Sequence, residues 1–134
     1  TKIVIVNRTI EKAEQLARRF SAAIDVKSFD DVSVALDRAS FVVNTTSLGM
    51  KGQPPLALDL SKLNHDALIT DIVYVPLITD FLKSAQNQGL KIVDGLGMLL
   101  HQAVPGFQHW FGQRPRVTSE LRALIEADLF QVKS

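Results

Sequence analysis

The 134-residue sequence contains no cysteine, so it offers no disulfide framework, no thiol nucleophile and no cysteine-ligated metal site. It has no apolar stretch near the roughly 18 residues that a membrane-spanning helix needs, and no signal peptide is visible. Its net charge is only +1, which gives no reason to expect nucleic acid or an anionic membrane as the main partner. A reducing cytoplasm fits this composition.

Common catalytic and metal-binding motifs are also missing. His65, His101 and His109 do not have the spacing of metal ligands, and no set of carboxylates accompanies them. The sequence contains no G-x-S-x-G, no H-E-x-x-H and no P-loop. We therefore expect no bound metal in this chain.

What the sequence does contain is a regular alternation of two apolar patterns, within a hydrophobic content of 46%. Short apolar runs predict strands at residues 2–6, 23–29, 41–44, 67–73 and 90–93. Helical spacing predicts helices at 9–20, 31–38, 78–88, 95–111 and 118–129, with Pro105 and Gly106 interrupting the fourth. Strands that alternate with helices indicate an α/β fold with a mostly parallel sheet and helices on both faces.

Parallel sheets bind ligands at the carboxyl ends of their strands, and the first predicted strand ends in Asn7-Arg8-Thr9. In a dinucleotide-binding fold, an acidic residue after the second strand selects NAD, whereas an Arg accommodates the 2′-phosphate of NADP. Arg8 can offer a planar fork to phosphate oxygens, and Thr9 begins a helix whose free N–H groups attract anions. Lys12 lies in the first turn of that helix. An exposed Arg and Lys beside an ordinary Thr N-cap explains these residues equally well.

Three later strand ends also carry polar or small residues. The loop after residue 44 begins Asn-Thr-Thr-Ser-Leu-Gly, which suits close approach of a ligand but also an ordinary turn. Tyr74 follows the predicted strand at 67–73, either as a donor to a substrate oxygen or as a core Tyr with a solvated tip. Gln102 lies in the second turn of the helix that follows Gly95 and Gly97, either near the same rim or on a solvent-exposed face.

Four segments in this order resemble the NADP-binding half of shikimate dehydrogenase: "VNRTIEKAEQLA", "VVNTTSLGM", "DIVYVPLITDFLKSAQNQG" and "DGLGMLLHQAVPGFQHWFG". The resemblance runs from about Ile3 to Pro115, and the third and fourth segments are its specific part because they are long and fixed in spacing. It implies a Rossmann-like, doubly wound fold and NADP-dependent interconversion of 3-dehydroshikimate and shikimate, in aromatic amino-acid (chorismate) biosynthesis. It divides the chain into an NADP-binding domain at 1–115 and a C-terminal helix at 116–134.

The same resemblance implies roles for individual residues. Asn7, Arg8, Thr9 and Lys12 would hold the 2′-phosphate of the adenosine. Thr46 would pass near the ribose and diphosphate, and Ile72 and Gly95 would meet the nicotinamide carboxamide through backbone groups, with Met98 packed nearby. Tyr74 and Gln102 would reach shikimate from the cofactor side. Lys12 stands where the family often has Arg, and Ile72 where it often has Met.

The family's glycine-rich phosphate loop, its first strand and its catalytic Lys and Asp would all precede Thr1. We therefore expect no catalytic residue in this chain, and we expect the chain to be a C-terminal part of a larger enzyme with an N-terminal catalytic domain as its partner. The two strands that would flank the first strand are expected to pair with upstream residues, with a second copy in a homodimer, or directly with each other.

Two other functions compete with the leading interpretation. Quinate/shikimate dehydrogenases and aminoshikimate relatives share the same motifs, although the Arg8 corner argues against an enzyme that prefers NAD. Alternatively, the isolated chain is a non-catalytic binding or assembly module. Titration of NADPH into this chain would distinguish a non-catalytic module from the NADP-binding half of a shikimate dehydrogenase.

Overall fold

A computed structural model describes residues 2–20, 23–37 and 39–131 of the chain. Its strands are β1 (Ile3–Asn7), β2 (Ile24–Ser28), β3 (Phe41–Asn44), β4 (Leu68–Asp71) and β5 (Lys91–Val93). Its helices are α1 (Ile10–Ala17), the 3-10 helix η1 (Phe29–Asp31), α2 (Val32–Leu36), α3 (Asp80–Asn87), α4 (Gly95–Phe111) and α5 (Ser119–Gln131). Strands and helices therefore alternate along most of the chain, as predicted.

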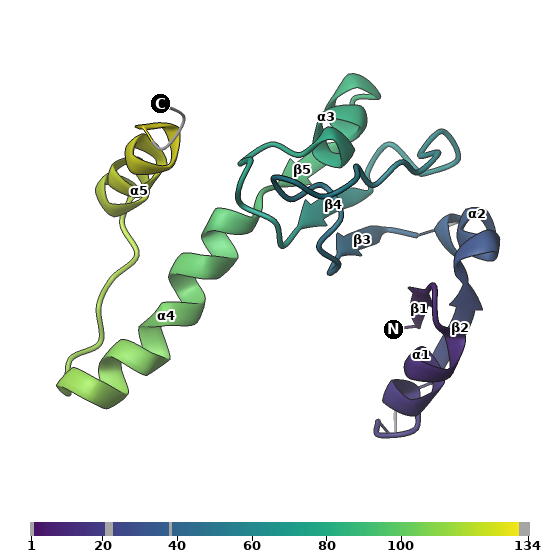
Figure 1. The fold of residues 1–134 in the computed structure, drawn as a ribbon, viewed down its shortest axis with the longest axis horizontal. Coiled ribbons are helices and arrows are strands. Elements are labelled where there is room, and N and C mark those ends of the chain that lie inside the picture. The colour runs from purple at the N-terminus through teal and green to yellow at the C-terminus, as the bar shows by residue number, and fades with distance from the viewer. Residues whose placement is uncertain (1, 21–22, 38, 132–134) are drawn as a thin grey trace.

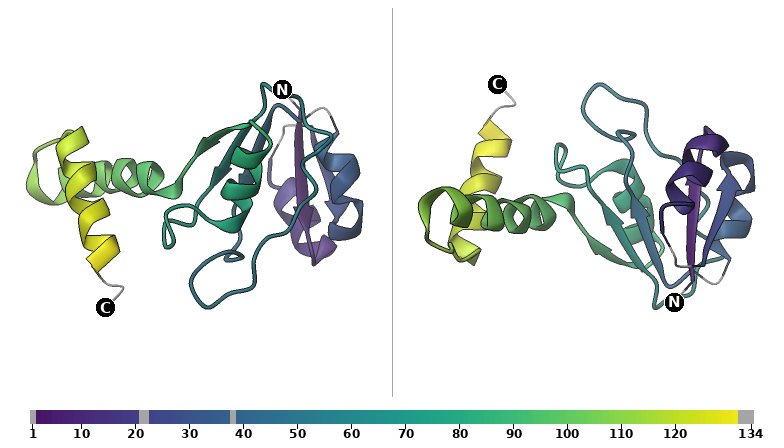
Figure 2. Two further views of the ribbon diagram at one scale, coloured as in Figure 1. Left: turned by 90° about the horizontal axis from the view of Figure 1, so that it is seen from above. Right: turned by 90° about the horizontal axis from the view of Figure 1, so that it is seen from below.

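The strands form two parallel sheets with a break between them. β1 pairs with β2, and β4 lies between β3 and β5. Figures 1 and 2 show that β1 and β3 are the strands on either side of the break. In a doubly wound sheet of order 3-2-1-4-5-6 that place belongs to the first strand, and none of the described strands occupies it. The predicted α/β class with a doubly wound, parallel arrangement is confirmed.

Apolar side chains are exposed on both strands that border the break. Ile3 of β1 is 46% exposed, and Phe41 and Val43 of β3 are 57% and 39% exposed. Short β-branched strands of this kind are typical of sheets that are buried on both faces. These apolar side chains are therefore exposed because both strands have the residue pattern of a continuous sheet, whereas the sheet is interrupted between them.

The hydrophobic core lies between the second sheet and the helices α2 and α3. Ile69 of β4 is fully buried against Phe81, Leu82 and Ala85 of α3. Leu36 of α2 joins the same cluster, together with three leucines of the connection between β3 and β4, at positions 56, 60 and 63. This core holds the carboxyl ends of β3 and β4 in place at one edge of the sheet.

Two predicted boundaries shift because of local hydrogen bonds. The strand predicted at 67–73 is shorter in the structure, because the Asp71 side chain accepts a hydrogen bond of 2.9 Å from the backbone N–H of Val73 and turns the chain. The helix predicted at 78–88 begins at Asp80, because Thr79 is its N-cap and its hydroxyl accepts from the N–H of Leu82. Gly89 follows this helix with a φ of 75°, as a C-terminal glycine should.

The predicted interruption of the fourth helix at Pro105 and Gly106 is wrong. α4 runs without a break from Gly95 to Phe111. A proline removes its own N–H from the helical ladder, and both Pro105 and His101, whose carbonyl lacks that N–H, are exposed residues. The bonds on either side therefore suffice to continue the helix.

The apolar face predicted for α1 is only partly buried. Ala13 is 2% exposed, whereas Leu16 is 44% exposed, and Phe20, which lies beyond the end of α1, is 58% exposed. The helical period thus predicted the helix, but it did not predict how much of its face is covered. Among the described residues, no helix is long and apolar enough to cross a membrane.

Candidate functional site

The Asn7-Arg8-Thr9 corner joins β1 to α1, and Asn7 shapes it. The Asn7 Oδ1 atom accepts a hydrogen bond of 2.9 Å from the backbone N–H of Thr9. Thr9 occupies the N-cap position of α1, as predicted, but its side chain makes no capping hydrogen bond. The Asn7 side chain is thus engaged with the backbone of the corner, which leaves only its amide NH2 to a ligand.

The two cations of this corner are open to solvent. Arg8 and Lys12 are both exposed. Within the described ranges, neither one forms an ion pair with a carboxylate. The first-turn N–H groups of a helix have no partner inside the helix, so this corner presents two cations and a helix N-terminus to solvent. Cationic side chains and first-turn N–H groups together can bind a phosphate group.

At the end of β3, Asn44 and Thr46 build the following turn. The Asn44 Oδ1 atom accepts from the N–H of Thr46 at 3.0 Å and from its hydroxyl at 2.8 Å. The Thr46 hydroxyl in turn accepts from the N–H of Leu48 at 3.1 Å. The Thr46 side chain, a predicted neighbour of the cofactor, is therefore used to shape this exposed turn.

A buried carboxylate at the end of β4 connects three segments. The Asp71 Oδ1 atom accepts from the Asn44 side-chain amide at 3.0 Å and from the N–H of Val73, and its Oδ2 atom accepts from the Thr79 hydroxyl at 2.8 Å. Asp71 and Thr79 are 1% and 0% exposed, and Asn44 is 4% exposed. The loops after β3 and β4 and the start of α3 are thus held together by one polar network.

The start of α4 packs directly on the backbone after β4. A Cβ atom placed on Gly95 would lie 2.5 Å from the carbonyl oxygen of Ile72 and 2.6 Å from that of Val73. These are distances that a real side chain does not tolerate. Gly95 is therefore needed so that the two segments can approach each other.

The predicted site residues fall into two groups in the structure. Ile72 and Gly95 lie in contact. The same two segments carry Tyr74, which is half-buried, and Met98 and Gln102, which are exposed. The corner with Arg8 belongs to the other sheet, across the break.

A second polar cluster lies at the N-terminus of α4. Asp94 caps the helix, with its Oδ1 atom accepting from the N–H of Leu96 at 3.1 Å. Its Oδ2 atom accepts from the guanidinium of Arg122, in α5, at 2.7 Å. This hydrogen bond raises the pKa of Arg122 above its ordinary value. Arg122 also pairs with Glu126 at 2.7 Å.

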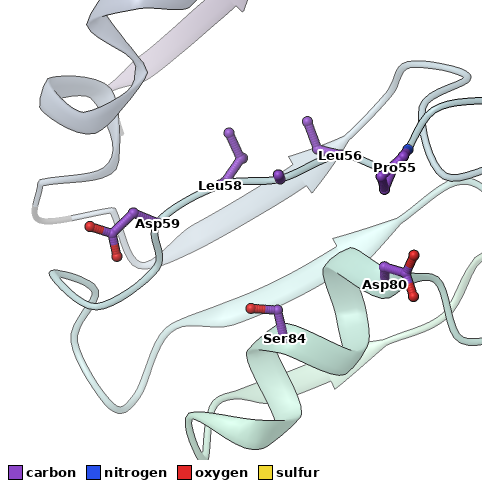
Figure 3. Close-up of a pocket in the computed structure, with 7 residues that line it drawn as sticks. Pro55, Leu56, Leu58, Asp59, Asp80 and Ser84 are labelled. Carbon is purple, nitrogen blue, oxygen red and sulfur yellow. The ribbon is translucent and has the colours of Figure 1, made fainter.

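A hollow among the described residues lies away from the predicted site residues. It has a volume of about 430 Å³ and is lined by Pro55, Leu56, Ala57, Leu58, Asp59, Asp80 and Ser84. Figure 3 shows these residues on the extended segment that passes α3 and on α3 itself. None of the predicted site residues lines it. Within the described residues, no group of His, Cys, Asp or Glu is arranged to hold a metal ion.

Sequence reasoning assigned no role to Asp71, Thr79, Asp94 or Arg122. The sequence did contain a signal that Asp71 is buried. Residues of one parity in a strand share a face, so Asn44 follows Val42 and Asp71 follows Ile69 on the faces that point to the core. The phase of these two polar residues predicts that each side chain points to the core, but it does not predict that they pair. No comparable signal linked Asp94 to Arg122, because they lie on different helices.

Two protein families match this chain, each over a different range of residues. The family described as shikimate / quinate 5-dehydrogenase matches residues 1–76. The family described as the C-terminal domain of shikimate 5′-dehydrogenase matches residues 95–119. The first of these matches covers more than half of the chain.

Curated relatives are similar along almost the whole chain. The shikimate dehydrogenase (NADP(+)) of Afipia carboxidovorans is 57% identical over 128 residues, which cover 96% of this chain and 46% of that protein. The protein of the same name from Azorhizobium caulinodans is 58% identical, with the same coverage. The chain therefore spans a little under half the length of the curated relatives it matches.

Solved structures show the same partial coverage. Quinate dehydrogenase from Corynebacterium glutamicum, in complex with NAD, matches 98% of this chain and 46% of its own, with a TM-score of 0.80 and 30% identity. Shikimate 5-dehydrogenase from Thermus thermophilus, in complex with NADP(H) and shikimate, matches 96% and 45%, with a TM-score of 0.73 and 27% identity.

Proposed function

The chain belongs to the shikimate / quinate 5-dehydrogenase family, and on this basis we propose that it is the NADP-binding part of a shikimate dehydrogenase. Such an enzyme interconverts 3-dehydroshikimate and shikimate by hydride transfer, in the biosynthesis of chorismate and aromatic amino acids. The observation that carries the proposal is the contact of Gly95 with the backbone of Ile72 and Val73. It joins the two segments on which the family resemblance is most specific.

The corner after β1 supplies the proposed site for the adenosine 2′-phosphate. Arg8 and Lys12 are exposed cations, and Thr9 begins α1. Because no acidic residue ends β1, a ribose 2′-hydroxyl has no carboxylate partner here, whereas a 2′-phosphate has a guanidinium. Asn7 contributes by holding the backbone of the corner.

The second sheet supplies the proposed site for the remainder of the cofactor and for one side of the substrate. Thr46 lies in the turn after β3, and Ile72 and Gly95 offer backbone groups, with Met98 one turn further along α4. Tyr74 and Gln102 supply a phenol and an amide that can bind the hydroxyl or carboxylate groups of shikimate. Bound NADPH would supply the hydride, and the role of this chain is to orient the two reactants.

The proposal includes groups that this chain does not supply. A Lys and an Asp of an N-terminal catalytic domain would transfer the proton that accompanies hydride transfer. That domain, in the same polypeptide, is the proposed partner of this chain. A homodimer is the proposed assembly, and the cytoplasm is the proposed location.

Quinate is the second candidate substrate. The specific observation in its favour is the similarity to a quinate dehydrogenase structure, with a TM-score of 0.80. That protein was solved with NAD, whereas the Arg8 corner of this chain favours NADP. Shikimate with NADP therefore stays the leading combination.

The test uses the whole polypeptide that contains this chain. Initial rates are measured with shikimate or quinate and with NADP⁺ or NAD⁺. We expect the highest kcat/KM for shikimate with NADP⁺, and a rise of roughly tenfold or more in the KM for NADP⁺ on Arg8→Ala, equivalent to about 1.4 kcal/mol of binding.

The matched control is Arg19→Ala, which removes an exposed arginine beyond the other end of α1. It should leave the KM for NADP⁺ unchanged. An unchanged KM for NADP⁺ in Arg8→Ala would disprove the cofactor assignment, and a preference for quinate would disprove the substrate assignment.

A further inference from the structure

One arginine of the C-terminal helix α5 forms an ion pair at the N-terminus of α4. The Arg122 guanidinium donates to the Asp94 Oδ2 atom at 2.7 Å, and its Nε atom donates to Glu126 in the next turn of α5 at 2.7 Å. Figure 1 shows that the chain leaves the second sheet along α4 and then returns, which brings α5 back towards the start of α4. The contact therefore joins two segments that the sequence separates by the whole of α4.

Asp94 connects this arginine to the proposed site. The same carboxylate that receives Arg122 also caps α4 through the N–H of Leu96. The next residue, Gly95, packs on the carbonyl groups of Ile72 and Val73. A displacement of Asp94 would therefore move the turn that carries Gly95 and Met98.

The guanidinium also lies against the turn itself. A Cβ atom placed on Gly97 would lie 3.9 Å from the Nη1 atom of Arg122. The guanidinium thus lies close to Gly97, in the first turn of α4, and pairs with the N-cap residue Asp94. These two contacts restrict both the capping side chain and the first helical turn.

The ion pair is better protected than the other ion pairs of the described residues. The side chains of Arg122 and Asp94 are 33% and 18% exposed, whereas those of Lys91 and Asp66 are 66% and 89% exposed. Apolar packing holds α5 only weakly, because none of its described side chains is fully buried, and Leu121 and Leu124 are 36% and 67% exposed. The charged contact is the specific link between the two helices.

We propose that Arg122 is a positioning residue, through which α5 holds Asp94 and the first turn of α4 in the orientation that the nicotinamide end of the cofactor requires. Arg122 acts through Asp94 and does not itself touch the reactants. The inference rests on the proposed function for its kinetic consequence, but the effect on α4 is a property of the protein without ligands.

The first experiment is amide hydrogen exchange on the whole, ligand-free protein, with the variants Arg122→Gln and Arg122→Lys. We expect exchange across residues 95–99 to become at least fivefold faster in Arg122→Gln, with Arg122→Lys closer to the wild type because it keeps a charge for Asp94. The matched control is Glu126→Gln, which removes the negative charge of the other partner of Arg122 and keeps the bond of Arg122 to Asp94. It should leave that segment unchanged.

The second experiment measures steady-state rates of the same variants below their unfolding temperatures. Arg122→Gln should raise the KM for NADP⁺ at least threefold or lower kcat by that factor, with partial rescue by Arg122→Lys. Unchanged exchange at 95–99 would overturn the proposal. Faster exchange with unchanged kinetic constants would also overturn it, since Arg122 would then stabilise the first turn of α4 without positioning it for the cofactor.

The two proposals fail differently. If the wild-type protein oxidises neither shikimate nor quinate, the proposed function is wrong, and the exchange experiment still decides whether Arg122 positions α4. If the wild type is active and Arg122→Gln behaves like the wild type in both experiments, only the role of Arg122 is wrong.

Discussion

The Asn44 side-chain amide donates to the Asp71 carboxylate at 3.0 Å, and both residues are buried although they are 27 positions apart. They lie opposite each other as the last residues of the paired strands β3 and β4. Asn44 also donates to the carbonyl of Leu48 at 3.1 Å and accepts from Thr46. Together with the two further hydrogen bonds that Asp71 accepts, this leaves no buried side-chain N or O atom unpartnered among the described residues.

Asp71→Ala should destabilise the protein substantially. It would leave the buried donors of Asn44, Val73 and Thr79 without their acceptor. Each such donor costs on the order of 1–3 kcal/mol. We expect the midpoint of thermal unfolding of the whole protein to fall by roughly 6 °C or more.

The matched control is Asp66→Ala, because the Asp66 side chain is 89% exposed in its pair with Lys91. Surface pairs of this kind contribute about 0–1 kcal/mol, so the midpoint should change little. Equal shifts for the two variants would show that the buried network does not stabilise the fold.

Gly95→Ala should disturb the site more than its small volume suggests. The new Cβ would lie 2.5 Å from a backbone carbonyl oxygen, and backbone cannot move aside as a flexible side chain can. We expect a loss of about 1–3 kcal/mol in stability, a lower unfolding midpoint, and a higher KM for NADP⁺ in the whole enzyme.

Gly106→Ala is the control within the same helix. A Cβ there would meet only Trp110 ring atoms at 3.9 and 4.0 Å. Replacement of glycine by alanine inside a helix normally stabilises it by roughly 0.5–1 kcal/mol. The two variants should therefore shift the unfolding midpoint in opposite directions, and a stabilising Gly95→Ala would contradict the packing described above.

Thr118→Ala should loosen the start of α5. The Thr118 hydroxyl accepts from the N–H of Leu121 at 3.2 Å, one residue before Arg122. Loss of an N-cap costs about 1 kcal/mol, which should appear as faster amide exchange in residues 119–123. Ser119→Ala is the neighbouring control, since Ser119 lies inside the helix. No difference between the two variants would argue against the cap.

The 134-residue chain alone should bind NADPH weakly. The corner with Arg8 and Lys12 offers sites for one phosphate, but the family's glycine-rich loop, which would supply backbone donors to the diphosphate, is not among these residues. Isothermal titration of NADPH into this chain and into the whole protein measures the difference. Equal affinities would show that the chain is a complete cofactor site.

Most of the secondary structure could be predicted because its signals are local. β-branched runs predicted β1 and β3, and the helical period predicted α4 with its observed bounds. The error at Pro105 arose because a local rule treats a proline as a helix breaker, whereas the bonds of the surrounding turns decide the outcome. The early end of β4 depends on a side chain that turns its own backbone.

The sequence by itself determined the α/β class, the order of strands and helices and, through long motifs, the family. These features follow from period, turn chemistry and spacing, which are properties of neighbouring residues. Only the tertiary structure decided that Asn44 faces Asp71, that Gly95 lies on the carbonyl of Ile72, and that Arg122 reaches Asp94. Each of these contacts joins residues far apart in the chain, so it depends on how the core packs the elements together and not on any local pattern.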